Sequence, residues 1–149
     1  MGLRSLFTPA FPLKLIEIAI CLTCLGMIRH YNLGFGGTVH TTLDRRLVGV
    51  IAFGGMILVT APMLIGLIAG EVAIEKSYQE VIYNVVGFIV MIVAGIMALE
   101  AHNLLRFLGF ETRTGKEARE AGLAMGALGI VNSIVYLIDA FVAYRVKRT

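Results

Sequence analysis

The stretch LVGVIAFGGMILVTAPMLIGLIAG, residues 47–70, contains no charged side chain. Two more uncharged runs follow it, VIYNVVGFIVMIVAGIMAL at 81–99 and AGLAMGALGIVNSIVYLI at 121–138. An α-helix rises about 1.5 Å per residue, so each run has roughly the length needed to cross a hydrocarbon layer of about 30 Å. The three runs therefore predict three membrane-spanning helices.

The composition of the whole chain agrees with a membrane protein. Its 149 residues are 58% hydrophobic and only 15% charged, with a mean hydropathy of +0.84. A soluble domain usually carries about 25% charged residues. A fourth apolar segment lies at about 12–30, and we expect it to be retained as a span. Arg29 and His30 lie at its end, where a signal peptide would have a small-residue cleavage site.

These segments predict an all-α fold, an integral membrane antiparallel four-helix bundle. The expected spans are about 12–30, 47–70, 81–103 and 117–144, so residues 1–149 form a single four-span membrane domain. Short connections between consecutive spans favour antiparallel neighbours. An even number of spans places both termini on the same side of the membrane.

The basic residues give no clear orientation. Six Lys and Arg residues lie on the side of the two termini and seven on the side of the other two loops, so the positive-inside rule is not decisive. The densest basic patch is Arg145, Lys147 and Arg148, which favours contact with anionic lipid and weakly favours cytoplasmic termini. With no basic block elsewhere, we expect no nucleic-acid partner.

Small residues recur four positions apart on three of the expected helices. In lipid, helices gain little by burying apolar surface against each other, so close backbone approach at small residues supplies much of the packing. Packing within the chain is the favoured interpretation, and an interface between copies or with other membrane proteins is the alternative. The predicted packing residues are Gly66, Gly70, Ala94, Ala98, Gly122, Gly126 and Gly129.

Charged residues near the span ends predict a polar cluster. Glu17 follows Lys14 by three residues, so the two share a helix face. Asp139 lies at a similar depth if the termini are on one side. Because an isolated charge in a bilayer is unfavourable, we expect Lys14, Glu17 and Asp139 to meet between the first and fourth helices. Structural pairing is favoured over a proton or cation site.

No residue pattern indicates catalysis. Cys21 and Cys24 form a C-x-x-C sequence, but both lie within an apolar span, where packing is a better explanation than redox chemistry. The three histidines lack the spacing of metal ligands, and no glycine-rich phosphate loop is present. We therefore expect no catalytic residue, no cofactor and no metal.

Four short segments carry a resemblance to a known family. They are Gly36-Gly37-Thr38, Asn84-Val85-Val86-Gly87, the segment Ala121-Gly122-Leu123-Ala124-Met125-Gly126, and Tyr136-Leu137-Ile138-Asp139. In this order they resemble the insect family of four-span septate-junction proteins, the snakeskin/pasiflora-like family. MARVEL-type four-helix proteins are a more distant likeness.

The resemblance implies a function that composition alone does not indicate. It implies cytoplasmic termini, a plasma-membrane location at lateral cell–cell junctions, and a non-enzymatic structural role in the paracellular barrier of epithelia or glia. The implied partners are the lipid bilayer and other junctional membrane proteins, with a homo-oligomer as a further possibility. The alternative is a small four-span transporter or a proton-conducting proteolipid, in which Glu17 or Asp139 would act as the functional carboxylate.

Overall fold

The computed structural model describes residues 9–31, 47–69, 78–107 and 113–148. Every regular element in these residues is helical: α2 (Ala10–Tyr31), the π-helix η2 (Val50–Gly54), α4 (Gly55–Ala69), α6 (Tyr78–Phe107) and α7 (Arg113–Arg148). The π-helix continues directly into α4, so that Leu47–Ala69 forms one candidate span. The described chain is therefore four long helices.

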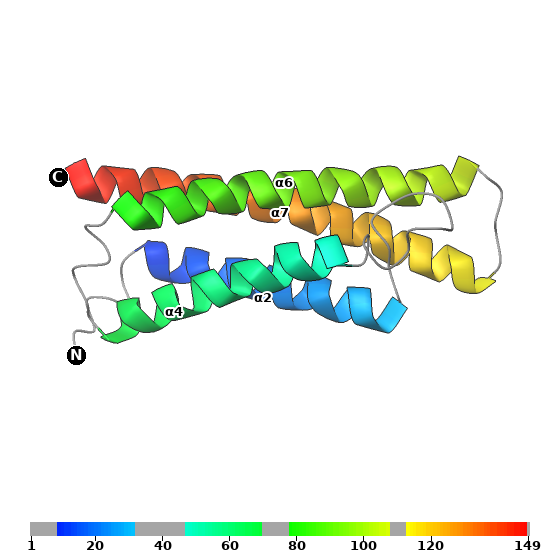
Figure 1. Cartoon of the computed structure of the whole chain (residues 1–149), viewed down its shortest axis with the longest axis horizontal. Coiled ribbons are helices and arrows are strands. Elements are labelled where there is room, and N and C mark those ends of the chain that lie inside the picture. Colours follow the sequence, from blue (N-terminus) through cyan, green and yellow to red (C-terminus); the bar gives the residue numbers. More distant parts are fainter. Residues whose placement is uncertain (1–8, 32–46, 70–77, 108–112, 149) are drawn as a thin grey trace.

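The four helices run antiparallel in sequence order. Figure 1 shows α2 and α6 running in one direction and α4 and α7 in the other. As a result, Ala10 at the start of α2 and Arg148 at the end of α7 lie toward the same end of the bundle (Figure 1). We call this end the Ala10/Arg148 end.

The helices do not pack equally on one another. α7 lies against both α6 and α2, and its contact with α6 is the most extensive among the described helices. α4 packs mainly on α2, whereas α6 approaches the second span chiefly at η2. The bundle thus has α7 and α2 as its central pair, with α6 and α4 on the outside of that pair.

The described helices are suited to a membrane on two grounds. Four of them, Ala10–Tyr31, Leu47–Ala69, Tyr78–Glu100 and Glu120–Arg148, are long and apolar enough to cross one. Their large apolar side chains also face outward: Leu58 is 78% exposed and Ile65 66% exposed. Water-soluble proteins bury such residues far more often. The predicted fold class, an all-α bundle of four membrane-spanning helices, is confirmed.

The interior of the bundle contains several polar and charged side chains. Apolar core residues such as Phe53 and Met91 are fully buried, but so are several polar and charged side chains. The largest of these are Lys14, Glu17, Asn84, Asn132 and Asp139. Polar groups inside and aliphatic groups outside are the arrangement expected when the surroundings are lipid.

Candidate functional site

The charged centre of the bundle is the ammonium group of Lys14. This side chain is only 1% exposed and donates a hydrogen bond of 2.7 Å from its Nζ to Oδ2 of Asp139. Lys14 belongs to α2 and Asp139, which is 0% exposed, to α7. Because the two helices run antiparallel, residues early in α2 and late in α7 reach the same level. The ion pair therefore joins the two central helices near the Ala10/Arg148 end.

Glu80 is a second partner of Lys14 that the sequence did not indicate. The third span was expected to begin at residue 81, which would leave Glu80 in a loop. In the structure, α6 begins at Tyr78, so Glu80 lies in its first turn. It is 4% exposed, and its Oε1 lies 3.2 Å from Lys14 Nζ. One ammonium group thus links α2, α6 and α7.

Glu17 completes the group, which we call the Lys14 cluster: Lys14, Glu17, Glu80 and Asp139. Glu17 lies one turn after Lys14 on α2 and is 0% exposed. Its carboxyl group interacts electrostatically with Asp139, Lys14 and Glu80. It also lies within hydrogen-bonding range of the Asp139 carboxyl group. The structure therefore brings together the three residues that the sequence singled out and adds Glu80.

A neutral side chain extends this polar layer toward the middle of the bundle. Asn132 of α7 is 0% exposed, and its Nδ2 donates to the backbone oxygen of Glu17 at 3.4 Å and to Sγ of Cys21 at 3.2 Å. The same amide lies 3.6 Å from Sδ of Met91 on α6. Asn132 therefore links α7 to both α2 and α6.

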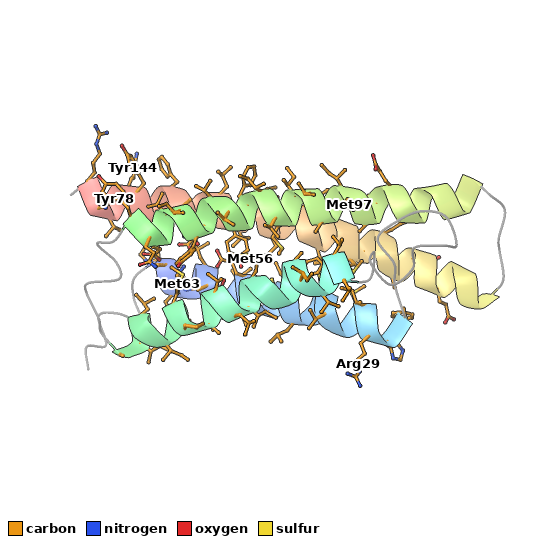
Figure 2. The ribbon with its side chains drawn as sticks, in the orientation of Figure 1. Arg29, Met56, Met63, Tyr78, Met97 and Tyr144 are labelled. Carbon is orange, nitrogen blue, oxygen red and sulfur yellow. The ribbon has the colours of Figure 1, made fainter. Side chains whose placement is uncertain are left out.

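The second span is joined to α7 by one buried hydrogen bond. The hydroxyl groups of Thr60 and Tyr136 lie 2.9 Å apart, and both residues are at most 2% exposed. The Tyr136 ring fits beside Gly87 of α6, where a Cβ atom would lie 2.7 Å from Cδ1 of Tyr136 and 2.8 Å from Cε of Met56. Figure 2 shows Met56 in the space between the helices. Gly87 therefore makes room for the ring that holds α4 to α7.

A close backbone contact between α6 and α7 is built from glycine. A Cβ atom on Gly126 would lie 2.8 Å from Cγ of Leu99 and 3.0 Å from the backbone oxygen of Gly95. A Cβ atom on Gly129 would lie 3.2 Å from Cα of Gly95. A Cβ atom on Gly95 would in turn lie 3.0 Å from the Gly126 oxygen. The Gly126 face of α7 is therefore occupied by α6 of the same chain.

The other predicted packing residues differ in how deeply they are buried. Ala94 and Ala98 of α6 are 0% exposed, and Gly122 of α7 is also buried. Gly66 of α4 is half-buried, and Gly70 lies outside the described residues. Gly95 was not predicted, because neither residue four positions away from it, Met91 or Leu99, is small. It lies next to Ala94 but is not part of the pair Ala94 and Ala98.

Aromatic and basic side chains gather near the Ala10/Arg148 end. Lys147 lies over the ring of Tyr78, Arg148 is 5.8 Å from the ring centre of Tyr144, and Arg145 is 5.0 Å from that of Phe141. Figure 2 shows Tyr78 and Tyr144 at this end and Arg29 near the other. Tyrosines with cations beside them are typical of the membrane–water boundary. We therefore expect this end of the bundle, which also holds the Lys14 cluster, to lie near a membrane surface.

The chemistry available in the described helices is that of ion pairs and hydrogen bonds. Cys21 and Cys24 are free and 0% exposed, as expected of packing residues. Among the described residues, no three His, Cys, Asp or Glu side chains are placed to hold a metal ion. The four charged groups of the Lys14 cluster are buried between the helices.

One curated protein supports the resemblance drawn from the sequence motifs. The chain is 26% identical over 140 residues to protein snakeskin of Bombyx mori, a match that covers 85% of this chain and 85% of that protein. This is a weak homology that extends over most of both chains. The likeness to MARVEL-type proteins stays a prediction. No model of a protein family matches the chain, and no solved structure matches it significantly.

Two of the motifs that carry the resemblance meet in the structure. The segment Asn84–Gly87 lies on α6, and the segment Tyr136–Asp139 lies on α7. Gly87 accommodates the Tyr136 ring, and Asp139 holds Lys14. Both segments therefore contribute side chains or space to the contacts that join the helices.

Proposed function

We propose that the protein is a non-enzymatic structural component of septate junctions between cells. The observation that carries this proposal is the similarity to protein snakeskin along 85% of the chain. It agrees with the septate-junction family that the sequence motifs resemble. The protein would lie in the plasma membrane at lateral cell contacts, with both termini in the cytoplasm, and support the paracellular barrier.

The interior of the bundle supports a structural role. Its polar side chains are used to join helices: Lys14 links three of them, and the Thr60–Tyr136 bond holds the fourth. Such contacts fix the helices against one another and leave the outward faces for lateral association. Because the Gly126 face already packs on α6, association with other junction proteins or a second copy uses other surfaces.

A loss-of-function experiment tests the barrier role. In an epithelium that expresses the protein, depletion should let a fluorescent dextran pass between cells, and the wild-type chain should restore the barrier. Gly126→Leu should fail to restore it, because the new side chain meets Leu99 and the Gly95 backbone. Gly26→Leu is the matched control, since a Cβ atom there has nothing within 4 Å. An unchanged barrier after complete depletion would refute the proposal.

The buried carboxyl groups are the reason to consider one alternative, a small transporter or proton-conducting proteolipid. In such proteins a functional carboxylate faces a pathway. Here Asp139 is hydrogen-bonded to Lys14, and both side chains are at most 1% exposed. A proton-flux measurement in liposomes that contain the purified protein and a pH-sensitive dye distinguishes the two functions. A proton flux that Asp139→Asn abolishes would establish the alternative, and a flux no greater than that of empty liposomes would support the structural role.

A further inference from the structure

The charges of the Lys14 cluster do not balance if every group is ionised. Three carboxyl groups, Glu17, Glu80 and Asp139, surround one ammonium group. The second span offers no further charge in its described part, since residues 47–69 contain no titratable side chain. From α7, the uncharged Asn132 and Tyr136 also lie near Glu17. Within the described residues, the fully ionised cluster would therefore carry an excess of negative charge in a buried position.

The hydrogen bonds show where this excess is concentrated. Lys14 donates to Oδ2 of Asp139 and lies beside Oε1 of Glu80, so its ammonium group is directed at those two residues. Neither carboxyl oxygen of Glu17 has a hydrogen-bond donor among the described residues, and Oδ1 of Asp139 has none either. These unpartnered oxygens belong to two side chains that are both 0% exposed.

The two groups that carry these unpartnered oxygens interact with each other. The Glu17 and Asp139 carboxyls lie within hydrogen-bonding range, yet two ionised carboxylates are both acceptors and cannot bond. Two like charges close together in a buried site disfavour each other's ionised form, because their repulsion adds to the cost of burying each one. A single proton removes both the repulsion and the lack of a hydrogen-bond donor. One carboxyl group becomes a donor, and the other stays an acceptor.

We propose that Glu17 and Asp139 form a proton-binding site in which the two carboxyl groups share one proton. Glu17, in its neutral form, donates an O–H hydrogen bond to Oδ1 of Asp139, while Oδ2 of Asp139 accepts from Lys14. The proton comes from water as the chain folds, and no other bond forms or breaks. With one proton bound, a single ammonium group faces two negative charges.

A metal cation is a poorer occupant than a proton. Cations such as Na⁺ and Ca²⁺ require several oxygen ligands arranged around one point. The described carboxyl groups form no set able to hold a metal ion. The ammonium group of Lys14 also lies against Asp139 and would repel a second cation. A proton needs only the two oxygens that lack a donor.

Infrared spectroscopy of the full-length protein in lipid nanodiscs tests the site directly. The wild-type protein at neutral pH should show the C=O stretch of a protonated carboxylic acid. The band should shift when glutamate or aspartate is labelled with ¹³C at the side-chain carboxyl. It should be lost in Glu17→Gln and retained in the control Glu100→Gln, which alters a carboxyl that is exposed on α6. The wild-type spectrum decides the matter even if a variant fails to fold.

Three results would overturn the proposal. The first is a folded wild-type protein with no protonated-carboxyl band at neutral pH, which would mean that Glu17 is ionised and solvated by water. The second is a band that persists in both Glu17→Gln and Asp139→Asn, which would place the proton elsewhere. The third is a thermal midpoint that rises when Na⁺ replaces choline at constant pH without any such band, which would identify a metal cation as the occupant.

Discussion

Lys14 of α2 and Asp139 of α7 are separated by 125 positions in the chain, yet Nζ of one lies 2.7 Å from Oδ2 of the other. Both side chains are almost completely buried, at 1% and 0% exposure. In a lipid environment an isolated charge is costly, whereas a charge with partners on neighbouring helices restricts how those helices can pack. Lys14 has such partners on two helices, since Glu80 of α6 is its second carboxylate.

The first prediction concerns the removal of the central cation. Lys14→Met should lower the free energy of unfolding by about 3–5 kcal/mol, the usual cost of removing one member of a buried pair, because it leaves the carboxyl groups of three helices without their cation. Asp139→Asn should cost less, since Glu80 remains 3.2 Å from the ammonium group. Thermal or denaturant unfolding in detergent measures both. Equal losses for the two variants would show that Glu80 does not support Lys14.

A second prediction addresses the hydrogen bond that joins α4 to α7. Tyr136→Phe should lower the free energy of unfolding by about 0.5–1.5 kcal/mol, typical of a buried hydrogen bond, because only the hydroxyl group is lost. Thr60→Val should have a similar effect, and the double variant should cost little more than either single change. Tyr144→Phe is the control, since Tyr144 is 44% exposed. Additive losses would mean that the two hydroxyl groups act independently.

Glycine packing provides the third prediction. Gly126→Ala should destabilise the protein by about 1–3 kcal/mol, as overpacking does, because the new methyl group would lie 2.8 Å from Leu99 and 3.0 Å from the Gly95 carbonyl oxygen. Gly55→Ala, on α4, should be neutral or stabilising, since nothing lies within 4 Å of its Cβ position. Unfolding of the two variants in the same detergent gives the comparison. An equal response at the two sites would contradict the packing between α6 and α7.

Membrane topology gives a fourth prediction. Epitope tags at Met1 and Thr149 should both be inaccessible to antibody on intact cells and accessible after permeabilisation. The antiparallel order of the four helices puts Ala10 and Arg148 toward one end, and the proposed orientation places that end in the cytoplasm. Staining of only one tag on intact cells would contradict the number of spans. Staining of both tags would show that the termini lie outside the cell.

The sequence was most informative where physical constraints act over long segments. Uncharged runs such as 47–70 predict spans, and together with the apolar segment at about 12–30 they predicted the four-helix fold. The approach of Lys14 to Asp139 was also foreseeable, because charges at matching depths on helices with a common end have few other partners. These inferences depend on helix length and direction, which the sequence specifies well.

Contacts that depend on helix rotation were not foreseeable. Glu80 was assigned to a loop because the uncharged run of the third span begins after it, at residue 81, and its role became visible only when α6 was found to begin at Tyr78. The bond between Thr60 and Tyr136 joins residues 76 positions apart and depends on which faces of α4 and α7 meet. The π-helix η2 likewise has no signal in an apolar run that fits a regular helix equally well.

The location of the protein in a polarised epithelium tests the central claim most directly. Antibody staining of the endogenous protein, together with a marker of septate junctions and a marker of intracellular membranes, distinguishes the possibilities in one image series. A structural junction protein should be concentrated at lateral cell contacts and coincide with the junction marker. A diffuse signal over the plasma membrane, or one confined to intracellular membranes, would contradict the account.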